Sequence, residues 1–211
     1  YFGISWVDKK IINNADLVIS DNISSFLIYR SDIVLMGSFL WSELIKKNKL
    51  SDKSKFENLE LSLIKKYRPE MIALKDMAMP YVMKYTRPFL TSWIVDKSFK
   101  ISPRSKLKNI LIIGGGTGYL DYELSKILKK IDQTKYNIFT TKKIAFFLDS
   151  DFKYKIFGFN HIDFKKIDLI IGRPGIGTLT DCVTYSIPIF GVGEPDNLEI
   201  QHNLSKIESS S

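Results

Sequence analysis

The residues best suited to chemistry form a glycine turn, Arg173-Pro174-Gly175-Ile176-Gly177-Thr178. The apolar run 167–171 before this turn is typical of a buried strand, and residues 179–185 continue with a helical pattern. A strand that leads through a glycine turn into a helix leaves free backbone N–H groups and the positive end of the helix dipole at one point. That arrangement suits a phosphate or a diphosphate.

A second glycine turn covers residues 114–118, between the apolar run 109–113 and a helical pattern over 119–131. Tyr119 stands where a dinucleotide fingerprint needs its third glycine, and no Lys-Ser or Lys-Thr pair completes a P-loop. NAD binding and P-loop chemistry are therefore disfavoured. Taken alone, this sequence is equally consistent with a tight turn that binds no ligand and with a ligand-binding site. A further strand, 186–193, also ends in glycine, and glycine turns at one sheet edge favour a nucleotide site.

The composition narrows the class of protein. The chain has 211 residues, 45% of them apolar, which is ample for a packed core. Its net charge of +8 comes mainly from scattered lysines, which suit contact with an anionic membrane surface or a phosphorylated substrate. The chain lacks an arginine-rich stripe, so nucleic acid is not an expected partner. A single cysteine, Cys182, fits the core of a cytoplasmic protein without internal disulfides.

Hydrophobic periodicity divides the chain into two parts. Helices are expected at 9–15 and 56–67, and strands at 16–20, 32–37 and 71–74. The basic stretch 97–108 contains Pro103 and has no apolar periodicity, so it is the expected linker. No apolar run approaches the roughly 20 residues of a membrane span.

The order of elements after residue 108 resembles the C-terminal, donor-binding domain of the GT-B glycosyltransferases, in particular the family that contains the peptidoglycan GlcNAc transferase. The matching segments are 112–118, 157–160, 168–193 and 199–203. Segments 15–21 and 34–39 are similar to the end of the acceptor domain of that family. The resemblance implies an α/β protein with two Rossmann-like domains: the C-terminal part of the acceptor-side domain at 1–96, a linker at 97–108 and the donor-binding domain at 109–211. The first domain is expected to be incomplete and the second to be truncated.

The resemblance also implies roles for individual residues. The nucleotide base is expected near the backbone of Asn160, the diphosphate at the N–H groups of 175–178, the ribose at Asp181, and the sugar at Glu199 and Asn203. Asp181 is shorter than the usual glutamate of the family, and Glu199 replaces a frequent glutamine. The expected donor-binding residues are Gly114, Gly115, Gly116, Thr117, Gly118, Asn160, Arg173, Gly175, Ile176, Gly177, Thr178, Asp181, Glu199 and Asn203. No catalytic base is named, because the family commonly carries it in a part that precedes Tyr1.

Several of these residues have a second interpretation. Asp181 also fits an acid that merely stabilises the first turn of a helix, and Arg173 fits either a surface cation or a partner of the leaving diphosphate. Asp149 and Asp151 match the Asp-x-Asp motif of metal-dependent glycosyltransferases, but Asp-Ser-Asp is also an ordinary turn sequence. The turn is the favoured interpretation, so no metal site is expected.

The expected function is sugar transfer from a nucleotide diphosphate donor, a UDP-sugar, to an unidentified acceptor, without a metal or another cofactor. The donor domain would stabilise the departing diphosphate electrostatically. Two alternatives stay open. Because of the negative charge of Glu199, a UDP-sugar hydrolase or a UDP-GlcNAc 2-epimerase is one alternative. The other alternative is a nucleotide-sugar-binding subunit without catalytic activity of its own. The oligomeric state is left open.

Overall fold

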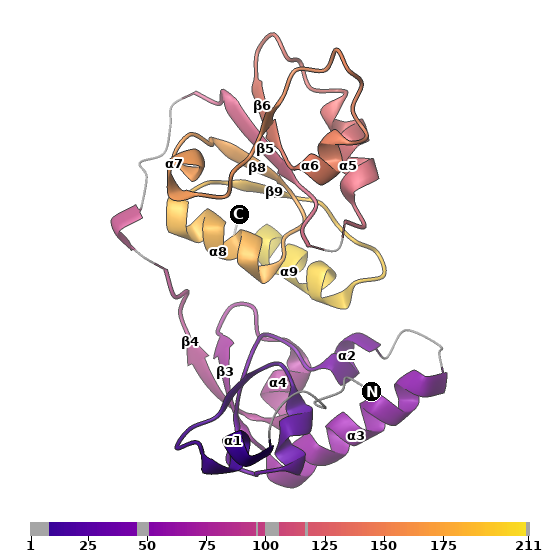
Figure 1. Cartoon of the computed structure of the whole chain (residues 1–211), viewed down its shortest axis with the longest axis vertical. Coiled ribbons are helices and arrows are strands. Elements are labelled where there is room, and N and C mark those ends of the chain that lie inside the picture. Colours follow the sequence, from indigo (N-terminus) through magenta and orange to yellow (C-terminus); the bar gives the residue numbers. More distant parts are fainter. Residues whose placement is uncertain (1–8, 46–50, 96, 100–105, 117, 210–211) are drawn as a thin grey trace. The chain divides into compact units, whose positions relative to one another are not determined.

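The computed structural model describes residues 9–45, 51–95, 97–99, 106–116 and 118–209. Its chain divides into two compact units, 1–92 with 196–202 and 93–195 with 203–211. Each unit contains its own parallel sheet, as Figure 1 shows. The mixed α/β class expected from the sequence is therefore confirmed. No helix in these described ranges is long and apolar enough to cross a membrane.

The first unit is built on a four-stranded parallel sheet in the order β1-β2-β3-β4. The strands are β1 (Ile19–Asp21), β2 (Val34–Met36), β3 (Glu70–Leu74) and β4 (Arg87–Thr91). The helices are α1 (Lys9–Asn14), the 3-10 helix η2 (Ser24–Ile28), α2 (Trp41–Ile45), α3 (Ser51–Tyr67) and α4 (Pro80–Tyr85). The strands and helices predicted for this part are all found. The first two strands are shorter than expected, and α3 begins earlier, at Ser51.

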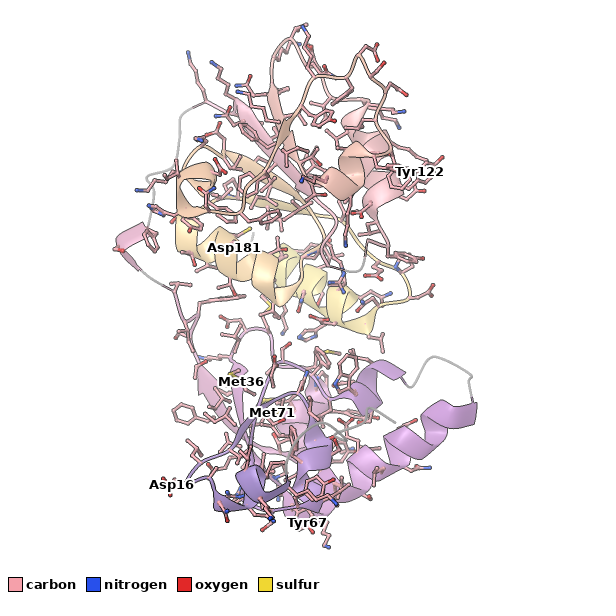
Figure 2. The ribbon with its side chains drawn as sticks, viewed as in Figure 1. Asp16, Met36, Tyr67, Met71, Tyr122 and Asp181 are labelled. Atoms are coloured by element: carbon pink, nitrogen blue, oxygen red, sulfur yellow. The ribbon has the colours of Figure 1, made fainter. Side chains whose placement is uncertain are left out.

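The core of the first unit lies on one face of this sheet. Met71 is buried there with Leu35, against helix residues that include Ile64 of α3. Met36 lies on a neighbouring strand but on the opposite face, where it is 42% exposed (Figure 2). This difference follows from the two-residue period of a strand, which turns alternate side chains to opposite faces.

The second unit has a five-stranded parallel sheet in the order β7-β6-β5-β8-β9. The strands are β5 (Asn109–Ile113), β6 (Asn137–Thr140), β7 (Lys155–Ile156), β8 (Leu169–Gly172) and β9 (Ile189–Gly191). The helices are the 3-10 helix η3 (Lys97–Phe99), α5 (Asp121–Leu128), α6 (Lys142–Ala145), α7 (His161–Phe164), α8 (Ile176–Tyr185) and α9 (Leu198–Ser209).

Both faces of this second sheet are covered, which explains why its strands read as continuous apolar runs. Leu111 of β5 packs on one face with Cys182 of α8, and Ile112 packs on the other face with Leu124 of α5. Cys182 fills space in the core, as expected, and burial together with the neighbouring charge of Asp181 raises the pKa of its thiol to about 12. The thiol therefore stays protonated at neutral pH.

The stretch predicted as a linker is only partly described. Residues 97–99 form η3, and residues 100–105 lie outside the described residues. Phe99 packs against the core of the second unit, with its ring centroid 4.1 Å from His161 and 6.0 Å from Tyr185. The start of this stretch is therefore anchored to the second unit.

The pairing of β5 with β8 is unusually close at its carboxyl end. Ile113 is the register partner of Gly172, and a Cβ atom at Gly172 would overlap the carbonyl oxygen of Ile113. Because that oxygen belongs to the backbone, it cannot rotate away as a side chain could. Glycine is therefore required at position 172 for steric reasons.

We predict that Gly172→Ala lowers the free energy of unfolding by at least about 1–3 kcal/mol, the usual cost of forcing an extra group into a packed site. Gly177→Ala is the control, because no atom of the described residues lies within 4 Å of a Cβ at Gly177. Urea unfolding followed by circular dichroism measures both variants. Equal stability of Gly172→Ala and the parent would contradict the close strand approach.

Candidate functional site

The second sheet changes its direction of winding between β5 and β8. The chain passes from β5 to β6 and β7 on one side, and then crosses to β8 and β9 on the other side. Ligands of open α/β sheets bind beyond the carboxyl ends of the strands at such a switch point. The turn after β5 and the turn after β8 are the two glycine turns identified from the sequence. The topology therefore brings them together at one place (Figure 1).

Three glycines of the turn after β5 are needed by the protein itself. A Cβ at Gly114 would overlap Oδ1 of Asp121, and one at Gly118 would lie 3.1 Å from Oδ2 of the same carboxyl group. Gly118 and Gly115 also have positive φ angles, of 73° and 81°. These glycines shape the turn around the buried Asp121. Thr117, which was also expected to bind the donor, lies outside the described residues.

Gly116 is different, because neither packing nor its backbone angle requires a glycine there. No described atom lies within 4 Å of a Cβ at this position, and its φ angle is not in the positive range. Its carbonyl oxygen accepts a hydrogen bond of 3.1 Å from Nζ of Lys143, which belongs to α6. Gly116 therefore presents bare backbone to open space, with a lysine ammonium group beside it.

The turn after β8 presents the N-terminus of α8. Gly175 is the N-cap of this helix, and its own N–H donates to the carbonyl oxygen of Arg173 at 2.9 Å. This corrects the expectation that the N–H of Gly175 faces a diphosphate. The next N–H groups, of Ile176, Gly177 and Thr178, have no acceptor within the described part of the chain. At Gly177, as at Gly116, a Cβ atom would have no neighbour within 4 Å among the residues that the structure describes.

Arg173 connects the turns that follow three strands. Its Nε donates to Oε2 of Glu194, beyond the end of β9, at 2.8 Å, and the two side chains are only 14% and 12% exposed. Its Cδ and Nη1 atoms lie 3.3 and 3.8 Å from a Cβ placed on Gly115, in the turn after β5. Nη1 also lies 3.2 Å from a Cβ placed on Gly175. Arg173 is therefore held between both glycine turns, and is not a free surface cation.

Asp181 lies on α8, and Figure 2 labels it there. It is the sixth residue of a helix that begins at Ile176, so it stands beyond the first turn, which contains no acidic residue. The helix-dipole effect falls off within the first turn and gives little reason for an acid at this position. Asp181 is half-buried, and this burial raises the pKa of its carboxyl group. A partly desolvated carboxylate is a strong hydrogen-bond acceptor for a hydroxyl group.

Asn203 has a structural role that the sequence did not indicate. It is completely buried in α9, so its amide cannot contact a bound sugar as expected. Instead, its Nδ2 donates to the carbonyl oxygen of Pro174 at 2.9 Å and holds the turn before α8. Its Oδ1 has no hydrogen-bond partner among the described residues. Glu199 lies in the first turn of α9, in the stretch 196–202 that belongs to the first unit, and its contact with a sugar remains a prediction.

Asn160 caps a different helix. Its Oδ1 accepts from the N–H of Asp163 at 3.0 Å, and its Nδ2 donates to Oδ2 of Asp163 at 2.7 Å, at the start of α7. Phe164 of α7 stacks on Tyr185 with ring centroids 4.6 Å apart, and Tyr185 is the last residue of α8. The described contacts thus place α7 at the end of α8 that is remote from the glycine turn. A base contact near Asn160 also remains a prediction.

The Asp-x-Asp pair lies toward the amino ends of the strands, opposite the glycine turns. Asp149 forms an ion pair of 2.9 Å with Lys129, which follows the C-terminus of α5. Because α5 begins at the carboxyl edge of the sheet and runs back, its C-terminus lies far from the glycine turns. Phe152 N–H donates to the carbonyl oxygen of Asp149 at 3.0 Å, as in an ordinary turn. The described residues contain no cluster of three or more His, Cys, Asp or Glu side chains suited to a metal.

Two residues of the site were not singled out by sequence patterns, namely Lys143 and Glu194. Both follow the carboxyl end of a strand, Lys143 after β6 and Glu194 after β9. Charged residues at these positions collect at one edge of a parallel sheet, so this rule would have indicated them. Their partners, Gly116 and Arg173, depend on the strand order, which the sequence alone does not give.

Comparison with known proteins agrees with this architecture. No protein-family model matches the chain, and no curated protein sequence is significantly similar to it. The crystal structure of CalG4, the calicheamicin glycosyltransferase, superposes with a TM-score of 0.53 at 12% identity, over 92% of this chain and 58% of that chain. The glycosyltransferase SnogD from Streptomyces nogalater gives 0.51 at 12% identity, over 93% and 62%.

This chain therefore spans about three-fifths of the length of both glycosyltransferases. Likeness at 12% identity shows a shared fold, and function has to be argued from the site. The Rossmann-like architecture expected from the resemblance to GT-B enzymes is supported. The closer relationship to the family of the peptidoglycan GlcNAc transferase stays a prediction.

Asp121 gives the site a testable pH dependence. Burial raises the pKa of its carboxyl group, although the charge of Lys143 opposes this shift. The folded protein therefore keeps a proton that the unfolded chain releases. Stability is expected to fall as the pH rises from the ordinary pKa of an aspartate through the raised value, and then to level off.

We predict that Asp121→Asn removes this titration. The difference in unfolding free energy between the variant and the parent should increase in favour of the variant as the pH rises through and above the ordinary pKa of an aspartate. Urea unfolding at several pH values measures this difference. The subtraction also removes the contribution of Asp181, whose raised pKa acts in the same direction in both proteins. A difference that does not change with pH would contradict a raised pKa for Asp121.

Proposed function

We propose that this chain binds a nucleoside diphosphate sugar at the switch point of its second sheet and belongs to a glycosyltransferase that passes the sugar to an acceptor. One observation carries the proposal. Two glycine turns at this point present three N–H groups that have no acceptor among the described residues, and two glycines, Gly116 and Gly177, where a Cβ atom would meet no described atom. Such bare backbone allows phosphate oxygens to approach closely, and the end of a helix favours their charge.

The shared fold with CalG4 and SnogD supports the same proposal, since both are glycosyltransferases. Sugar transfer releases a nucleoside diphosphate, so negative charge develops on the leaving group. The N-terminus of α8 and the guanidinium group of Arg173 are fixed before a ligand arrives, and preorganised groups of this kind stabilise developing charge effectively. We propose that they replace a metal ion in this reaction.

Asp181 is the proposed partner of the ribose hydroxyl groups. It lies on α8, beyond the N–H groups that would hold the diphosphate. The donor is proposed to be a UDP-sugar, as the resemblance to the family of the peptidoglycan GlcNAc transferase implies. Glu199 is kept as the proposed sugar contact. The acceptor is not identified, and a reducing, cytoplasmic location remains part of the proposal.

Titration of the protein with UDP by calorimetry tests this proposal. We predict that UDP binds equally well with and without EDTA, because protein groups supply the neutralisation. We further predict that Gly177→Ala weakens UDP binding by about ten- to a hundredfold, the value of one lost hydrogen bond to a charged group. A Cβ at Gly177 would occupy the space that the phosphate needs, while the helix itself gains about 0.5–1 kcal/mol from the replacement of glycine by alanine.

Val183→Ala is the matched control, since Val183 is exposed on the later part of the same helix. It should leave UDP binding unchanged. Loss of UDP binding in EDTA would contradict the metal-free site and would favour a metal site at Asp149 and Asp151 instead. Unchanged binding by Gly177→Ala would show that phosphate does not approach α8 at its N-terminus.

A further inference from the structure

The charged groups around the turn after β5 do not contribute equally to the positive charge available to a ligand. Arg173 is the cation on the β8 side, but Glu194 pairs with it at 2.8 Å and compensates its charge. Asp121 lies beneath the turn, where burial raises its pKa and disfavours the carboxylate. Glu194 therefore offsets part of the charge that Arg173 offers to a ligand on this side of the turn.

Lys143 is the cation on the opposite side of this turn, at the end of β6. It is exposed, and its Nζ donates to the carbonyl oxygen of Gly116 at 3.1 Å. No carboxylate of the described residues forms an ion pair with it, whereas Lys126 and Lys129 of the same unit pair with Glu123 and Asp149. Among the described residues, the Lys143 ammonium group therefore makes no direct ion pair, and its charge acts at longer range on the carboxyl group of Asp121.

The strand order arranges the parts of the site in a row. Asp181 and the N-terminus of α8 follow β8, the open backbone of Gly116 follows β5, and Lys143 follows β6. A nucleotide with its ribose at Asp181 and its first phosphate at α8 would extend its second phosphate toward Gly116 and Lys143. A second phosphate adds one negative charge, and Lys143 is placed to meet that charge.

We propose that Lys143 is a specificity-determining residue, through which the site prefers nucleoside diphosphates over nucleoside monophosphates. This inference rests on the proposed function, because it assumes that the nucleotide binds at the switch point. A purely structural role is the alternative. In that case, the hydrogen bond from Lys143 would only hold the turn at Gly116, and its loss would weaken both kinds of ligand alike.

The ratio of the affinities for UDP and UMP separates the two roles. Calorimetry with both nucleotides is carried out on the parent and on Lys143→Gln, Lys143→Arg and Lys142→Gln. Lys142 is the matched control, because it is an exposed lysine of the same helix without a described contact to the turn. We expect Lys143→Gln to lose at least about tenfold in affinity for UDP and to change within about twofold for UMP. Lys143→Arg should keep the preference for UDP, and Lys142→Gln should behave as the parent.

Each other outcome has a definite meaning. UDP binding by Lys143→Gln as tight as that of the parent would overturn the inference and leave the proposed function intact. An equal loss for UDP and UMP would assign Lys143 a structural role and would also overturn it. Similar losses in Lys142→Gln would mean that only the general positive charge of this surface matters, and would overturn the specific role of Lys143. A parent that binds neither nucleotide would overturn the proposed function and the inference together.

Discussion

The candidate site depends on the pairing of β5 with β8. The two strands come so close at Ile113 and Gly172 that only a glycine fits at position 172, and both strands end there. Strand β5 leads into the glycine turn before α5, and strand β8 leads into the turn before α8. Because β5 and β8 are neighbours without being consecutive in the sequence, this single pairing creates the switch point of the sheet. A change in its register would separate the two turns.

The glycines of these turns fall into two physical groups. Gly114 and Gly172 are required by close contacts within the protein, and Gly115 and Gly118 by their positive φ angles, so these glycines are explained by the fold. Gly116 and Gly177 have no such explanation, since a Cβ atom at either position would meet no atom of the described part of the chain within 4 Å. The first group holds the backbone in place and the second leaves it bare. The ion pair of Arg173 and Glu194, whose side chains are mostly shielded from solvent, then fixes the turns relative to each other before a ligand binds.

Much of this unit could be predicted from the sequence, because local signals carry it. The apolar runs before the two glycine turns are strands β5 and β8, and the helical pattern after Arg173–Thr178 is α8. The side-chain partners could not be predicted in the same way. Lys143 and Gly116 are 27 residues apart, and Asn203 and Pro174 are 29 residues apart, so these bonds depend on strand order and on helix packing. The start of α8 at Ile176 also decided the interpretation of Asp181, and helix boundaries are the least certain part of a sequence pattern.

The central claim is that a nucleoside diphosphate binds where the turns after β5 and β8 meet. The most direct measurement is the change in backbone amide resonances of the isotope-labelled protein on titration with UDP. The account predicts that the largest shifts belong to Ile176, Gly177 and Thr178, with Gly116 also affected, because their N–H groups and backbone meet the phosphates. Shifts concentrated around Asp149, or confined to the first unit, would contradict it.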